Sequence, residues 1–90
     1  MSTNFGPRLR GIIHVLKAQK TAPTRNQFME LEALAKEVES SQDSLSEAIQ
    51  FRLRVLLSCT ERTSQGVYRI LDSDLFVWAL DELNRLTDYK

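Results

Sequence analysis

The fold depends on the stretch SLSEAIQFRLRVLLSCTER, residues 44–62, because its polarity pattern fits two kinds of structure. Apolar and polar side chains alternate over 49–55, which is typical of a half-buried strand. Over the full stretch, however, polar residues recur at helical spacing on one narrow arc, and apolar residues fill the opposite side. The longer pattern outweighs the shorter one, so we predict a helix over 44–62. A hairpin through Gly66 and residues 67–71 is the alternative.

The apolar arc of this predicted helix is unusually broad. Phe51, Val55, Leu57 and Cys59 extend it well beyond a single stripe. A helix that is apolar around most of its circumference needs neighbours on several sides. We therefore expect it to lie at the centre of a helical bundle.

Capping signals divide the preceding sequence into separate helices. Thr24-Arg-Asn-Gln27 and Ser44-Leu-Ser-Glu47 both match the capping box, in which each end of the motif bonds the other's backbone amide. One unbroken helix from about Thr24 to Thr63 is the alternative, since heptad spacing of apolar residues permits it. Strong cap chemistry inside a helix would contradict that arrangement, so a break at 40–44 is predicted.

The first and last helices follow from similar signals. Pro7 suits a first helical position, and Pro23 prevents the first helix from continuing much beyond Lys20. Asp72-Ser73-Asp74 supplies caps and negative charge for the last helix. The sequence predicts one all-α domain over 1–90, with a flexible N-terminus at 1–6. Its fold is a small antiparallel bundle of about four helices over 7–20, 25–39, 44–62 and 74–88.

Composition excludes several classes of function. Twelve Lys and Arg balance twelve Asp and Glu, which argues against a dedicated binder of nucleic acid or membrane surfaces. One Cys and one His exclude an internal disulfide and an ordinary zinc site, and no metal or cofactor is expected. The sequence has no apolar run long enough for a membrane span and no signal peptide at its start. A lone thiol fits a reducing compartment, so we expect a cytoplasmic protein.

The order of charges is more informative than their sum. Residues 1–27 and 51–69 are basic overall, whereas residues 28–50 and 70–90 are acidic overall. In an antiparallel bundle, this alternation would place unlike charges on neighbouring helices. The pattern therefore predicts which helices are neighbours, and it could also set the register of a homodimer.

One segment resembles the helix-turn-helix motif of DNA-binding proteins. Its apolar residues between Leu34 and Ala48, including Leu45, sit where that motif buries side chains. Glu39, however, occupies the turn position that usually requires Gly, and Ser40 replaces the apolar residue that fills the turn. Carboxylates on the second helix would also repel phosphates. We expect an ordinary helical hairpin, with DNA binding as the alternative.

The polar flank of the first helix offers a second route to nucleic acid. Arg10, His14 and Lys17 share this flank, and they are the candidate nucleic-acid contacts. The local sequence places neither a nucleophile nor an orienting acid beside His14, so we predict no catalytic residues and no enzyme.

Aromatic residues near the C-terminus are the candidates for a recognition surface. Trp78 and Tyr89 fall close together on the wheel of the last helix, with Val77 further round and Tyr68 just before the helix. Aromatic residues are enriched among interface anchors. Trp78 is either covered within the monomer or covered by a partner protein or a second copy. We predict a non-enzymatic protein–protein interaction module, a small regulator, adaptor or inhibitor. A small DNA- or RNA-binding regulator is the alternative.

Overall fold

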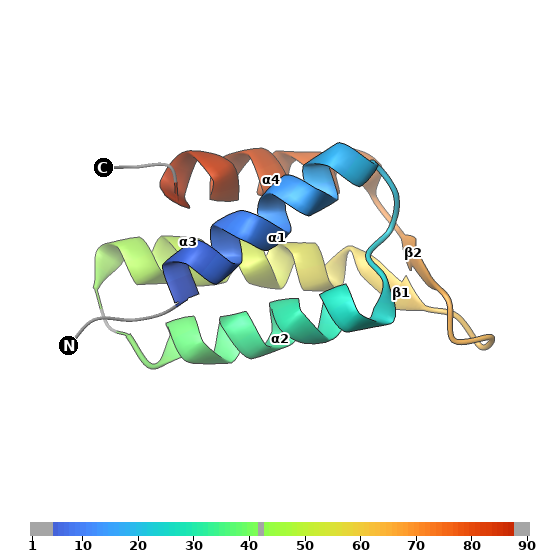
Figure 1. Ribbon diagram of the computed structural model, residues 1–90, viewed down its shortest axis with the longest axis horizontal. Helices are drawn as coiled ribbons and strands as arrows, with labels where there is room; N and C mark the ends of the chain where they lie inside the picture. The colour runs from blue at the N-terminus through green and yellow to red at the C-terminus, as the bar shows by residue number, and fades with distance from the viewer. Residues whose placement is uncertain (1–4, 42, 88–90) are drawn as a thin grey trace.

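The computed structural model describes residues 5–41 and 43–87, and it confirms a four-helix bundle (Figure 1). The helices have fifteen residues each, and two short strands join the third helix to the fourth. No helix within these ranges is both long enough and apolar enough to cross a membrane. The elements in chain order are α1 (Phe5–Gln19), α2 (Arg25–Glu39), α3 (Ser44–Ser58), β1 (Thr60–Arg62), β2 (Tyr68–Ile70) and α4 (Ser73–Thr87).

Consecutive helices run antiparallel and close into a ring (Figure 1). α1 packs against α2 and α4, and α3 packs against the same two helices from the other side. The hairpin of β1 and β2 projects from one end of the bundle. Each of the four helices therefore has two principal neighbours, and α1 and α3 lie at opposite corners of the ring.

Apolar side chains from all four helices meet in one core. They recur at helical spacing, so that one face of each helix is withdrawn from water. Some apolar side chains are only partly buried, among them Ile12 of α1 and Phe28 of α2. The largest fully buried side chains are Leu9, Ile13, Leu16, Leu31, Leu34, Val38, Leu53, Leu56 and Leu83.

α2 ends at Glu39 and α3 begins at Ser44, which confirms the predicted break between them. The predicted cap of α2 is also confirmed, whereas that of α3 is corrected. The hydroxyl of Thr24 accepts a hydrogen bond from the Gln27 amide at 3.2 Å, and the Gln27 side chain accepts one from the Thr24 amide at 2.9 Å. At the start of α3, however, the cap is Asp43 rather than Ser44. Its carboxylate accepts from the Ser46 amide at 2.7 Å, because Asp43 is extended and Ser44 is already helical. The predicted capping box at Ser44 is therefore wrong by one residue.

α3 ends at Ser58, so the predicted helix over 44–62 is too long at its C-terminal end. Residues 60–62 instead pair with 68–70, with Thr60 opposite Ile70. The Thr60 hydroxyl donates to the Leu56 carbonyl at 2.9 Å, and this bond occupies an acceptor that further helix would have used. The alternating segment 49–55 stays helical. The structure thus combines the predicted helix with a hairpin that begins later than the alternative placed it.

Three other expectations about the helices are corrected. α3 is not central, since it occupies one corner of the ring and leaves Phe51 58% exposed. α1 begins at Phe5, so residues 5 and 6 of the expected flexible N-terminus are helical. The remainder of that segment, residues 1–4, lies outside the described residues. α4 begins at Ser73, one residue earlier than predicted, and the predicted last residue, 88, lies outside the described residues.

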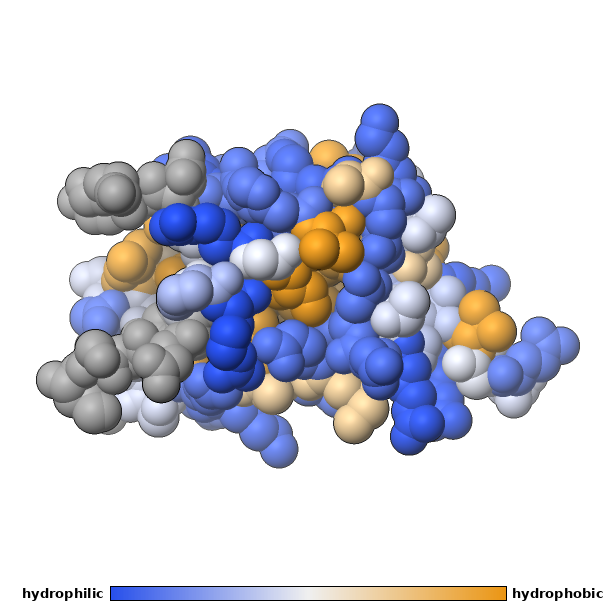
Figure 2. All heavy atoms as spheres, viewed as in Figure 1, coloured by the Kyte–Doolittle hydropathy of each residue, from blue (hydrophilic) through white to orange (hydrophobic). Residues whose placement is uncertain are grey.

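Ion pairs around the ring confirm the prediction from charge order. Each of the four helix–helix boundaries carries at least one pair between a basic helix and an acidic helix. Exposed ion pairs contribute little to stability, so these pairs act mainly in choosing neighbours. Figure 2 shows that the face carrying α1 is largely hydrophilic, with apolar atoms gathered near its middle and in smaller groups toward both ends. The pairs are Arg8 with Glu30 and Glu37, Lys17 with Asp81, Arg52 with Glu82, and Arg54 with Glu39.

A candidate protein-binding surface on the outer side of α3 and α4

Two exposed aromatic rings lie near one arginine at the boundary of α3 and α4. The guanidinium carbon of Arg52 is 5.8 Å from the ring centroid of Phe51 and 5.5 Å from that of Trp78. Both distances fall within the range of cation–π attraction. The Phe51 side chain is 58% exposed and that of Trp78 is 39% exposed. The two rings therefore belong to one solvent-facing site.

Arg52 is held in place by bonds to both helices. Its guanidinium donates to the Glu82 carboxylate at 3.2 and 3.3 Å and to the Ala48 carbonyl at 3.0 Å. Arg85 donates to the same carboxylate oxygen at 2.8 Å. The hydrogen bonds from Arg85, and next from Arg52, hold the pKa of Glu82 below its ordinary value. The lowered pKa favours the charged carboxylate, and the hydrogen bonds to Glu82 and Ala48 hold the arginine beside the two rings.

Further apolar side chains extend this site along both helices. Val55 follows Phe51 by one helical turn and is half-buried, and Leu75 precedes Trp78 by one turn and is 40% exposed. We call Phe51, Val55, Leu75 and Trp78 the aromatic face. Large exposed apolar side chains that cluster on a folded monomer are typical of a binding surface.

The structure separates the residues that were predicted to form one partner-binding site. Trp78 is on the aromatic face, but Val77 lines a cleft on another flank of α4. Tyr68 is half-buried, and its ring stacks on Phe28 with centroids 4.8 Å apart, which ties the hairpin to α2. Tyr89 lies outside the described residues.

Sequence reasoning missed Phe51 as a surface residue because it assigned every apolar residue of α3 to the core. A signal was present, since Phe51 falls next to Ser58 on the helical wheel, at the edge of the polar arc. An aromatic residue at the edge of a polar arc is a candidate for an interface as well as for the core.

The candidate nucleic-acid contacts on α1 face α4. Arg10 donates to the Thr87 carbonyl at 2.6 Å, and the Lys17 ammonium pairs with Asp81. His14 is exposed and lies near Lys17 beside α4. Two of the three predicted contacts are therefore engaged within the bundle.

The helix-turn-helix resemblance is not matched by the geometry. α2 and α3 lie antiparallel along their lengths, as in a helical hairpin, whereas the DNA-binding motif crosses its helices at about 90–120° (Figure 1). Leu45, which that motif would bury, is 44% exposed, and the neighbouring Ser46 is buried in its place. The segment is therefore a helical hairpin and not a helix-turn-helix motif.

The surroundings of the Cys59 thiol disfavour its charged form. The Cys59 thiol is buried, and its pKa is raised by burial and then by the nearby charge of Asp72. A thiol in such surroundings is a poor nucleophile. Over residues 5–41 and 43–87, no group of three or more His, Cys, Asp or Glu side chains is placed to hold a metal ion.

No protein-family model, curated protein or solved structure gives a significant match to this chain. The aromatic face and the charges around it are therefore the features from which a function follows.

Proposed function

We propose that this protein is a non-enzymatic protein–protein interaction module of the cytoplasm, acting as a small regulator, adaptor or inhibitor. The observation that carries the proposal is the pair of exposed rings, Phe51 and Trp78, that both lie within 6 Å of the Arg52 guanidinium. Trp and Arg are enriched among the residues that dominate binding energy. A buried lone thiol at Cys59 fits a reducing compartment.

The fixed geometry of the aromatic face favours binding. Because Arg52 is only 20% exposed and bonds to both Glu82 and Ala48, few rotamers remain to be lost when a partner docks. The partner would place apolar side chains over Phe51 and Trp78. The exposed guanidinium of Arg85 and the carboxylate of Glu82 would orient it at the edge. Either another protein or a second copy of this chain could supply these apolar and charged side chains.

The proposal is tested by affinity capture with tagged protein from lysate of the source cell, divided into nuclease-treated and untreated halves. We expect a stoichiometric protein partner that survives nuclease. Trp78→Ala and Phe51→Ala should each reduce its recovery at least tenfold, as expected for interface anchors. Met29→Ala is the matched control, because Met29 is 51% exposed and lies on α2.

Three results would count against the proposal. Loss of every partner on nuclease treatment would favour nucleic acid. Equal effects of Met29→Ala and Trp78→Ala would remove the aromatic face as the binding site. Unfolding of the isolated Trp78→Ala protein, seen by circular dichroism, would make Trp78 a core residue. Sedimentation of the purified protein separates the homodimer from the complex with another protein.

A further inference from the structure

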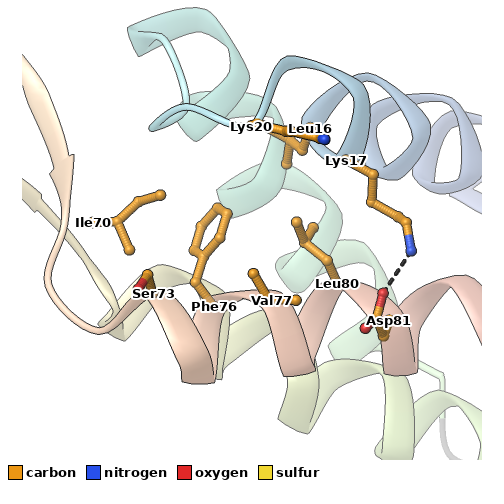
Figure 3. Close-up of a pocket in the computed structure, with 9 residues that line it drawn as sticks. All are labelled: Leu16, Lys17, Lys20, Ile70, Ser73, Phe76, Val77, Leu80 and Asp81. Carbon is orange, nitrogen blue, oxygen red and sulfur yellow. Dashed lines mark hydrogen bonds and ion pairs between the residues drawn. The ribbon is translucent and has the colours of Figure 1, made fainter.

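An apolar cleft lies on the flank of α4 that faces α1, away from the aromatic face (Figure 3). Its volume is about 350 Å³, and the last turn of α1, the first turns of α4 and strand β2 surround it. Phe76 and Leu80 rise from α4 toward α1, and Ile70 stands at the β2 end. The apolar lining consists of Leu16, Ile70, Phe76, Val77 and Leu80.

The floor and the mouth of this cleft differ in exposure. Leu16, Phe76 and Leu80 are buried, so the floor is continuous with the core of the bundle. Val77 is 52% exposed and marks the mouth. A concave apolar site of this size, with few polar groups, lies at the lower end of the range for small-molecule sites.

The charged groups at the rim determine which ligand the cleft would prefer. Lys17 and Asp81 pair with each other at one end, as Figure 3 shows, and so neutralise each other. Lys20 also lines the cleft, and it forms no ion pair with any acid among the described residues. The rim therefore keeps one uncompensated positive charge beside an apolar floor.

We propose that this cleft binds a small aliphatic carboxylate. The alkyl tail would lie against Ile70 and Val77, above the buried Phe76 and Leu80, where it replaces water at the exposed apolar surface, and the carboxylate would sit beside Lys20. The volume suits a chain of roughly eight carbons better than a bulky ligand. This site is separate from the aromatic face, since Val77 and Trp78 project about 100° apart from α4 and reach different neighbours.

The test is titration of isotope-labelled protein with octanoate, below the concentration at which micelles form, followed by nuclear magnetic resonance. We expect shifts in the amide signals of the cleft, while the indole signal of Trp78 on the aromatic face stays in place. Octanoate should bind about two- to fivefold more tightly than octanol, because the Lys20 charge is partly screened by water. Octyltrimethylammonium should bind most weakly. Hexanoate should bind roughly fifteenfold more weakly than octanoate, at about fourfold for each lost methylene.

Two variants and one matched control locate the site. Val77→Asp places a carboxylate at the mouth and should weaken octanoate binding at least tenfold. Val15→Asp is the control, because Val15 is an equally exposed helical valine that lies outside the cleft. Lys20→Gln should reduce the affinity for octanoate to that for octanol.

Several results would overturn the proposal. Equal binding of octanoate and octanol by the unaltered protein would remove the carboxylate preference. Equal effects of Val77→Asp and Val15→Asp would place the ligand elsewhere. Shifts confined to the aromatic face, or no shifts at millimolar octanoate, would exclude the cleft as a carboxylate site.

Discussion

Replacement of Gly11 by alanine should stabilise this protein. Gly11 lies in the interior of α1, and a Cβ atom built on it meets no other atom within 4 Å. Glycine inside a helix is less favourable than alanine by roughly 0.5–1 kcal/mol, because the free backbone loses more entropy on folding. No clash opposes this gain. We expect the free energy of unfolding to rise by about 0.5–1 kcal/mol and the melting temperature to rise by roughly 2–8 °C.

Replacement of Gly66 by alanine should instead lower the free energy of unfolding. Gly66 has a φ of 79° in the turn between β1 and β2, a conformation that side chains with a Cβ rarely adopt. Its amide donates to the Thr63 carbonyl at 3.0 Å, which fixes the turn. Forcing alanine into the left-handed region costs about 1–2 kcal/mol. Gly66→Ala should therefore lower the free energy of unfolding by about 1 kcal/mol, after allowing for the smaller entropy of its unfolded chain.

Thermal and urea unfolding, followed by far-ultraviolet circular dichroism, measure both variants. The urea dependence of the free energy should be unchanged, because neither methyl group alters the surface exposed on unfolding. If Gly11→Ala leaves stability unchanged or lowers it, α1 is not a continuous helix through Gly11, or another surface already occupies the space beside it. If Gly66→Ala is stabilising, the turn is not left-handed at that residue.

Three further predictions concern the core, a helix cap and the thiol. Leu83→Ala should lower the free energy of unfolding by about 2–5 kcal/mol in urea titrations, because Leu83 is fully buried in the core. The backbone hydrogen bond from Ser46 holds the pKa of Asp43 below its ordinary value. The stabilisation from this cap is therefore complete above the ordinary aspartate pKa and is lost as the pH falls through the lowered value. Asp43→Asn should keep the cap and flatten this acid dependence in thermal melts, whereas Asp43→Ala should lower the melting temperature at neutral pH. Cys59 should react with thiol reagents only as the structure opens, so equal rates in buffer and in urea would contradict its burial.

Local chemistry predicted much of the helical framework. The capping box at Thr24, the block at Pro23 and the acidic cap at Asp72 are interactions between residues close in sequence. Such interactions act before any tertiary contact is known, so they can be recognised directly. The order of charges predicted the neighbours in the ring as well, because each helix has one dominant sign of charge.

The hairpin was harder to predict because its cause is not local. Thr60 continues the polarity pattern of α3, and nothing nearby in sequence shows that β2 will pair with it. The Leu71 amide donates to the Cys59 carbonyl at 2.6 Å, so a residue beyond β2 satisfies the end of α3. Tertiary pairing overrides helical periodicity here.

The candidate site was predicted only in part for a similar reason. Trp78 is visible as an aromatic residue outside the core stripe of α4. Its partners Phe51 and Arg52 belong to α3, and the contact depends on how the two helices pack. Val77 and Trp78 were predicted to belong to one recognition surface. Adjacent residues on a helix project about 100° apart, however, and here they reach different neighbours.

The equal lengths of the four helices have a consequence for how the chain folds. A fifteen-residue helix is near the limit at which an isolated helix forms in water, and a hairpin with three-residue strands is marginal by itself. No element can therefore persist without its neighbours, and no pair of helices completes the shared core. Amide protons buried in all four helices should exchange through one common opening of the whole bundle, while those of the hairpin exchange through a smaller local opening. The protein should behave as a single cooperative unit with one loosely attached edge.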